Sequence, residues 1–122
     1  VGGGSAMLAG WGAALGHARS WVFTHRGVLH FKTDYSLMEA ETSLASGRVD
    51  ASCCFEGYLV LHVEDGEEAA ANAFRFNNLV LLAAGFPRTA EMLDREGFEV
   101  VEIDNRDCAK LDGGMSCLSL RF

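Results

Sequence analysis

The sequence predicts an α/β fold built of about two ββαβ-type units. Residues 73–120 follow the order β-hairpin, helix, strand, short turn and strand. Residues 28–63 show a looser version of that order, without a strong sequence repeat between the two stretches. Of the 122 residues, 49% are hydrophobic and 22% are charged, a balance typical of one folded domain rather than a disordered chain.

Two strands joined by a tight turn open the second unit. Asn77 and Asn78 form a typical hairpin dipeptide between residues 73–76 and 79–83. The second of these strands reads Leu-Val-Leu-Leu-Ala, which indicates a strand in the middle of a sheet.

The clearest helix of the chain is predicted over residues 89–97. Met92 and Leu93 supply its inward face, charged residues cover its outward face, and Gly97 ends it. Residues 98–103 alternate partly between apolar and polar side chains and indicate the strand that follows.

The first unit contains shorter elements, with strands expected over residues 28–32, 36–39, 41–45 and 58–63. In the first of them, the period of two places Val28, His30 and Lys32 on one face. Residues 50–55 are expected to form a helical turn in which Cys53 and Cys54 serve packing.

Residues 1–26 are expected to form a leader with a short helix over residues 6–18, ahead of a domain at residues 27–122. The start, Val-Gly-Gly-Gly-Ser, lacks the basic and apolar regions of a secretory signal. No apolar run approaches the roughly 20 residues of a membrane span. The four cysteines have no metal-like spacing, so reduced thiols in a cytoplasmic protein are expected.

The net charge bears on the kind of partner that the chain can bind. The net charge of −7 argues against nucleic-acid binding and suits a cationic substrate. The acidic residues 64–68 are expected to form a solvated turn, and residues 104–110 a polar loop or single turn.

The last twelve residues, 111–122, contain the first candidate for chemistry. Gly113 and Gly114 permit a positive φ or a close backbone approach to a ligand. The residues from Gly114 onward are expected to form a short strand that delivers Cys117 just after the bend. Chemistry alone leaves two roles open for Cys117, a buried small hydrophobe or a nucleophile. It leaves two roles open for His30 as well, a structural role, which is the commoner one for such a histidine, and a catalytic role.

A resemblance to a known family favours the catalytic role for both Cys117 and His30. Lys110-Leu-Asp-Gly-Gly-Met-Ser-Cys-Leu-Ser-Leu-Arg-Phe122 resembles the carboxy-terminal signature of the dimethylarginine dimethylaminohydrolases, members of the guanidino-group-modifying pentein superfamily. The segment Gly27-Val-Leu-His-Phe-Lys-Thr33 resembles their catalytic-histidine segment. Ala70-Ala-Asn-Ala-Phe74 and Ala84-Gly-Phe-Pro-Arg-Thr89 lie between them in the expected order. The resemblance covers residues 27–122.

The resemblance implies a partial pentein fold and a Cys/His mechanism. Pentein folds arrange about five ββαβ modules around a central channel, of which this chain would form about two, from the carboxy-terminal part. Cys117 would attack the guanidinium carbon of a methylated arginine or related guanidino compound, and His30 would act as acid and base. The backbone of Leu111 would hold the amino-acid end of the substrate. No metal or organic cofactor is implied.

One residue of the histidine segment favours this family over a neighbouring one. Arginine deiminases typically show His-x-Asp, and that aspartate binds the guanidinium. Here Lys32 stands in its place and Asp34 is out of register by two, which favours a dimethylarginase-like reaction.

The resemblance also leaves an alternative open. The family's guanidinium-binding carboxylates and the arginines that hold the substrate carboxylate come from an amino-terminal half. The alternative is a truncated, catalytically idle half-domain that self-associates or binds a small molecule. A homodimer or a separate amino-terminal half is the expected partner, because an incomplete propeller leaves exposed edges.

Overall fold

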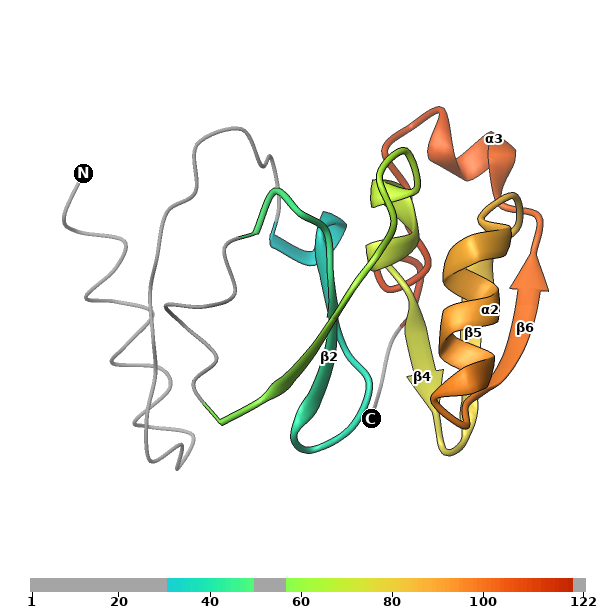
Figure 1. The fold of residues 1–122 in the computed structure, drawn as a ribbon. Coiled ribbons are helices and arrows are strands. Elements are labelled where there is room, and N and C mark those ends of the chain that lie inside the picture. Colours follow the sequence, from blue (N-terminus) through green and yellow to red (C-terminus); the bar gives the residue numbers. More distant parts are fainter. Residues whose placement is uncertain (1–30, 50–56, 120–122) are drawn as a thin grey trace, which may run out of the picture.

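The computed structural model describes residues 31–49 and 57–119, which form two small sheets lying side by side (Figure 1). The expected helix at residues 6–18, the strand residues 28–30 and the turn at residues 50–55 lie outside the described residues.

Each sheet has three strands with the same topology. The first contains β1 (Tyr35–Leu37), β2 (Thr42–Ala45) and β3 (Leu59–His62), and the second contains β4 (Phe74–Phe76), β5 (Leu79–Ala83) and β6 (Glu99–Ile103). In both, the first two strands are antiparallel and the third runs parallel to the second, which is the central strand. The two stretches therefore share one strand order, as the sequence predicts.

The register pairs apolar residues across the parallel strands. Leu44 lies opposite Leu61 in the first sheet, and Val80 lies opposite Val100 in the second. The described residues also form short or medium helices. Two of them lie between strands, η3 (Glu68–Ala71) and α2 (Pro87–Arg95), while η1 (Phe31–Thr33) precedes β1 and α3 (Arg106–Ala109) follows β6.

The hairpin between β4 and β5 follows the prediction. Asn77 has a φ of 55°, a left-handed conformation that asparagine tolerates better than most residues. The single turn expected within residues 104–110 is also present, as α3.

Helix α2 begins two residues before its predicted start, because Pro87 occupies its first turn, where a missing N–H costs nothing. Its end is fixed by Gly97, which has a φ of 90°. The Phe98 amide donates to the Leu93 carbonyl at 3.1 Å, and the Gly97 amide donates to Asp94 at 3.0 Å. This pair of bonds is a Schellman motif, so the predicted glycine stop is confirmed.

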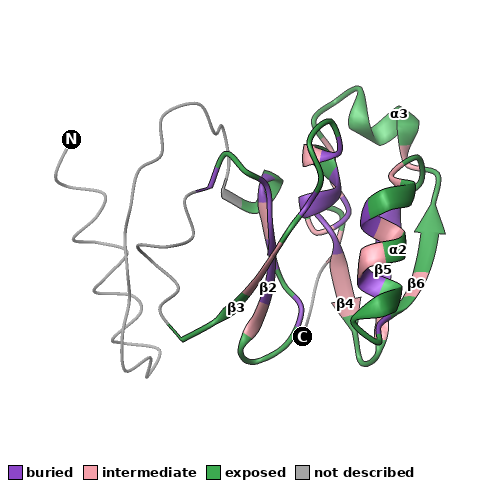
Figure 2. Cartoon of the chain, in the orientation of Figure 1, coloured by how far each residue is buried: buried purple, intermediate pink, exposed green. Residues whose placement is uncertain are grey.

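One apolar core joins the two sheets. Figure 2 shows buried residues on β2, β5 and the inner side of α2. The buried members of the core are Met38, Leu44, Val63, Ala70, Ala71, Ala73, Val80, Leu82, Leu93 and Phe98. Because these residues come from both units, neither sheet buries its apolar face alone.

Polar contacts cross between the units as well. The Ser36 hydroxyl donates to the Ala71 carbonyl at 2.7 Å. Arg75 on β4 donates to the Glu39 carboxylate at 2.8 Å and lies over the Phe98 ring, 5.6 Å from its centroid. These contacts tie β1 to η3, and the turn after β1 to β4.

Two sequence-based strand assignments are wrong. Phe31–Thr33 form a 3₁₀ turn, so the alternation expected for residues 28–32 does not reach Lys32. Residues 115–118 form a helical turn, in which Cys117 and Leu118 both donate to the Gly114 carbonyl, at 3.1 and 3.2 Å. The physical reason is that the Ser116 amide, which a strand would need for pairing, donates to the side chain of Asn72.

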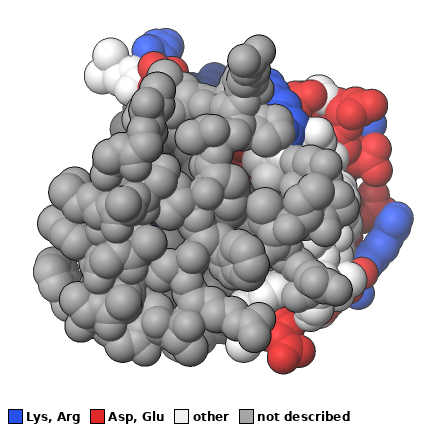
Figure 3. All heavy atoms as spheres, turned by 90° about the vertical axis from the view of Figure 1, so that its left-hand side faces the viewer, with Lys and Arg blue, Asp and Glu red and all other residues white. Residues whose placement is uncertain are grey.

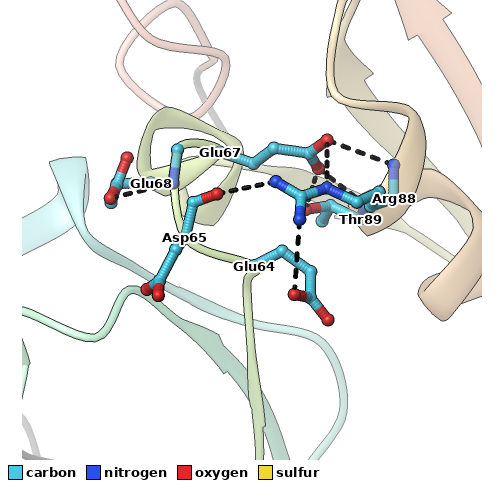
Figure 4. Close-up of polar contacts among 7 residues, drawn as sticks. Glu64, Asp65, Glu67, Glu68, Arg88 and Thr89 are labelled. Carbon is cyan, nitrogen blue, oxygen red and sulfur yellow. Dashed lines mark hydrogen bonds and ion pairs between the residues drawn. The ribbon is translucent and has the colours of Figure 1, made fainter.

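The expectation of a solvated acidic turn at residues 64–68 is wrong for Glu67, which is buried with its carboxylate at the first turn of α2 (Figure 4). Its carboxylate accepts hydrogen bonds from the Thr89 amide at 2.8 Å, the Thr89 hydroxyl at 2.7 Å and the Arg88 amide at 3.2 Å. The N-cap residue of α2, Phe86, makes no side-chain hydrogen bond to these amides. Glu67 therefore satisfies the free amides at the start of α2 from a distant segment.

The Arg88 side chain links the same cluster to Asp65 and Glu64. Its guanidinium donates to the Asp65 carbonyl at 2.6 Å and lies 3.6 Å from the Glu64 carboxylate (Figure 4). Burial raises the pKa of Glu67, but the hydrogen bonds from Thr89 and Arg88 and the charge of Arg88 outweigh it, so the pKa lies below its ordinary value.

The remaining surface carries mixed charges. Acidic and basic side chains of described residues alternate along the edge of the face in Figure 3. Most pairs are exposed, such as Arg95 with Glu91 and Lys110 with Asp107, and each is worth only about 0–1 kcal/mol. None of the described helices is both long and apolar enough to cross a membrane.

We expect Glu67→Gln to lower the free energy of unfolding by about 1–3 kcal/mol, because it removes a charged acceptor from three donors. Urea denaturation measures this change. The control is Glu64→Gln, since the Glu64 side chain is 58% exposed and its loss should be close to neutral. Equal effects of the two variants would contradict the capping role.

The same carboxylate predicts a pH dependence. Because the pKa of Glu67 is lowered in the folded state, its stabilisation is complete above the ordinary titration range of a glutamate, about pH 4. It is lost as the pH falls through the lowered value. Urea midpoints measured from pH 6 down to pH 3 should therefore fall more steeply for the natural chain than for Glu67→Gln.

Candidate functional site

Cys117 lies on a single helical turn that follows α3. The chain reverses at Asp112, which has a φ of 56°, and passes through Gly113 and Gly114 before the turn begins. The Cys117 side chain is exposed. An exposed thiol at a turn is accessible to a substrate, which argues against the alternative of a buried packing cysteine.

The side chain of Asn72, at the end of η3, holds this turn. Asn72 is only 5% exposed. Its Oδ1 accepts a hydrogen bond from the Ser116 amide at 2.8 Å, and its Nδ2 donates to the Cys117 Sγ at 3.6 Å. One carboxamide therefore contacts both the backbone of the turn and the thiol.

Both glycines before the turn are required by close packing. A Cβ on Gly114 would lie 2.1 Å from Asn72 Nδ2, and a Cβ on Gly113 would lie 2.9 Å from the Cys108 carbonyl oxygen. The predicted close approach is thus present, but it is to other parts of the chain. The positive φ belongs to Asp112 and not to either glycine.

The surroundings of the thiol favour its ionised form. The hydrogen bond from Asn72 lowers the pKa of Cys117 most, because a donor stabilises the thiolate. Partial burial acts in the opposite direction. The backbone of Gly114 and the positive charge of Lys32 act in the same direction as Asn72, so the pKa lies below its ordinary value.

Two cavities border the segment. One of about 240 Å³ is lined by Thr33, Asn72, Phe86, Asn105, Gly113 and Gly114, among others. A second of about 330 Å³ includes Ser116 and Lys32 in its lining. Residues next to Cys117 in the sequence, and Asn72, which contacts its thiol, therefore line cavities at the molecular surface.

Of the other two predicted site residues, the structure describes Leu111 but not His30. Leu111 is 86% exposed, and its amide donates to the Cys108 carbonyl at 2.9 Å at the end of α3. His30 lies outside the described residues, so its approach to Cys117 stays a prediction. Within the described ranges, no group of three or more His, Cys, Asp or Glu residues is arranged to hold a metal ion.

Asp34 has a structural environment. It is 2% exposed, accepts a hydrogen bond from the Ser46 hydroxyl at 2.5 Å and lies 3.8 Å from the Arg48 guanidinium. This carboxylate therefore fixes the strand pair β1–β2 and is not directed at Cys117.

Asn72 is the site residue that the sequence analysis did not assign. It lies within the Ala70–Phe74 motif, but nothing in that motif indicates its contact with residues 44 and 45 positions away. The available signal was a polar side chain directly after three alanines, which predicts a buried asparagine in need of partners.

Comparison with known proteins relates this geometry to a family. No family model matches the sequence. A curated relative, the N(G),N(G)-dimethylarginine dimethylaminohydrolase of Pseudomonas aeruginosa, is 39% identical over 95 residues, which is 78% of this chain and 37% of that protein. Over this stretch the chain is homologous to the dimethylarginine dimethylaminohydrolases. An uncharacterised protein of Aeropyrum pernix is 35% identical over 65 residues, 52% of this chain and 24% of that protein.

Solved structures of dimethylarginine dimethylaminohydrolases share the fold. The Pseudomonas aeruginosa enzyme, as a cysteine-to-serine mutant complexed with citrulline, matches with a TM-score of 0.74 and 37% identity over 80% of this chain and 38% of that one. An adduct with 4-chloro-2-hydroxymethylpyridine matches with a TM-score of 0.74 and 38% identity, over 80% of this chain and 39% of that one.

The α/β pentein fold predicted from the sequence is confirmed by this match. The chain spans less than two fifths of the length of the dimethylarginine dimethylaminohydrolases that it matches. Two three-stranded units of like topology account for the described part.

We expect Gly114→Ala to destabilise the chain by about 1–3 kcal/mol, because the new methyl group displaces the buried Asn72 carboxamide from its partners. Urea denaturation measures the effect. Gly47→Ala is the matched control, since a Cβ there has no atom within 4 Å and its φ is not positive. A neutral Gly114→Ala would contradict the packing described for the turn.

Proposed function

We propose that this chain carries the nucleophile of a dimethylarginase-like amidine hydrolase, which converts methylated arginine to citrulline and a methylamine. The observation that carries the proposal is the Cys117 thiol, exposed on a turn within a chain homologous to these enzymes, with a pKa lowered by a donated hydrogen bond. Support also comes from the relative whose cysteine-to-serine mutant holds citrulline.

Cys117 begins the reaction. Its thiolate attacks the guanidinium carbon and forms a C–S bond, since a thiolate is a strong nucleophile and a neutral thiol is not. The tetrahedral adduct then breaks the bond between the guanidino carbon and the methylated nitrogen. His30, in the role given by the resemblance, donates the proton that the departing methylamine needs.

Water completes the reaction. His30, now neutral, takes a proton from a water molecule that attacks the S-alkylthiouronium carbon. The C–S bond breaks, the thiolate of Cys117 is regenerated, and citrulline leaves. The charges balance without an oxidant or reductant.

Binding of the substrate draws on more than the described residues. The exposed backbone of Leu111 is the proposed contact for the amino-acid end of the substrate. The carboxylates that hold the guanidinium in the resemblance come from another part of such an enzyme. We infer that a further part of the enzyme or a second copy of this chain supplies them, since positioning accounts for much of the rate. A cytoplasmic location remains part of the proposal.

Citrulline release from asymmetric dimethylarginine tests the proposal. Cys117→Ser should lower the rate at least about a thousandfold, as loss of a nucleophile does elsewhere. Cys108→Ser is the matched control, because Cys108 is also an exposed thiol on the same segment and should leave the rate unchanged. His30→Gln should cost about a hundredfold or more.

Alkylation gives a second measurement of the same site. Chloroacetamidine resembles a guanidinium, so it should modify Cys117 faster than iodoacetamide does. Equal rates with the two reagents, together with no citrulline from folded protein, would favour the idle half-domain instead. A mixture with a separate amino-terminal half would then show whether the missing carboxylates restore turnover.

A further inference from the structure

Asn72 is a buried polar group with two long-range partners. Its side chain is 5% exposed and lies at the end of η3, while its partners belong to the turn after α3. The contacts join residues 44 and 45 positions apart in the sequence. A buried carboxamide is costly unless it is bonded, so these contacts fix its position.

The hydrogen-bond chemistry also fixes which way the carboxamide faces. The Ser116 amide is a donor and has no lone pair to offer, so only Oδ1 can face it. The NH₂ group must then point to the Cys117 sulfur, at 3.6 Å. A flipped amide would place two donors against each other and an oxygen lone pair against a developing thiolate.

We propose that Asn72 is a positioning residue for Cys117, which orients the nucleophile through Ser116 and donates a hydrogen bond to its sulfur. The inference rests on the proposed function only in treating Cys117 as the reacting group.

One side chain, Asn72, both positions the Cys117 sulfur and stabilises a negative charge on it. Oδ1 accepts from the amide of Ser116, in the Met115–Ser116 peptide one residue ahead of Cys117, so the turn cannot shift without breaking the bond at 2.8 Å. Gly114 permits this approach, because any Cβ there would collide with the carboxamide. The donor on the same side chain then acts on a sulfur whose distance is already set.

The donated bond serves two steps of the proposed reaction. Before attack, it stabilises the thiolate relative to the thiol. When water attacks the S-alkylthiouronium carbon, the C–S bond breaks and the electron pair returns to sulfur. Nδ2 then stabilises the departing thiolate as it stabilised the attacking one.

Asn72→Asp separates the two contacts. The carboxylate still accepts from the Ser116 amide, but it offers the sulfur a lone pair and a negative charge in place of a donor. Asn78→Asp is the matched control, since it adds the same charge at the exposed hairpin turn between β4 and β5.

The readout is the rate at which iodoacetamide alkylates Cys117 in the full chain, followed from pH 5 to pH 10 by peptide mass spectrometry. At pH 7 we expect Asn72→Asp to react about tenfold more slowly than the natural chain, as loss of a bond to a charged group implies. Near pH 10 the two rates should converge, because the thiol is then ionised in both. Asn78→Asp should follow the natural profile throughout, and Cys108 in the same digest should react alike in all three proteins.

Three results would overturn the inference. They are an unchanged pH profile in folded Asn72→Asp, an equal change in Asn78→Asp, and a slower rate that persists near pH 10, which would indicate blocked access and not ionisation. If circular dichroism shows Asn72→Asp to be unfolded, Asn72→Ser replaces it, since serine is small and uncharged. The same slowing at neutral pH is expected.

The measurement is independent of turnover. Alkylation needs no substrate, so an Asn72-dependent profile without citrulline release, even after a separate amino-terminal half is added, would uphold this inference and count against the proposed function. Citrulline release with an Asn72-independent profile would do the reverse.

Discussion

The structure depends on one constraint, the burial of both polar residues that flank the short helix η3. Glu67 before the helix and Asn72 after it are 6% and 5% exposed, and a buried polar group must find partners inside the protein. Glu67 finds them at the start of α2, and Asn72 finds them on the turn that carries Cys117. Between them, Ala70 and Ala71 belong to the shared core, and the Ala71 carbonyl accepts a bond from Ser36. Six consecutive residues thus connect both sheets, α2 and the cysteine turn.

Glu67 and Asn72 each form hydrogen bonds to groups of a distant segment, but Glu67 supplies a negative charge and Asn72 supplies a neutral donor. The first turn of α2 presents free amides and the positive end of a helix dipole, and an anionic carboxylate satisfies both. The cysteine turn presents an exposed thiol, and a neutral carboxamide supplies it with a donor without adding charge. In each case the pKa of the acidic group is lowered by donors that the fold has already oriented. Preorganised donors of this kind need no rearrangement when the charge develops.

The proposed reaction draws on this arrangement and on groups beyond it. The described residues supply an ionisable nucleophile, an exposed backbone at Leu111 and a nearby positive charge at Lys32. A lysine near the sulfur favours the thiolate but also repels a guanidinium, so carboxylates are needed to bind the substrate. The described residues near Cys117 thus favour the thiolate but do not bind the cation. The chain also spans only 37% of its curated relative. For both reasons it is proposed to carry the nucleophile of the site and not the whole site.

The sequence by itself determined the local features, because their causes lie within a few residues. The Asn77-Asn78 hairpin, the glycine stop of α2 and the order hairpin, helix, strand over residues 74–103 follow from turn chemistry and hydrophobic period. The four motifs over residues 27–33, 70–74, 84–89 and 110–122 together indicated the family. Only the tertiary structure decided that residues 115–118 form a helical turn, that Glu67 is buried, and that Asn72 contacts the thiol. Each of these depends on partners at least 21 residues away, and local propensity carries no information on which distant donor or acceptor will arrive.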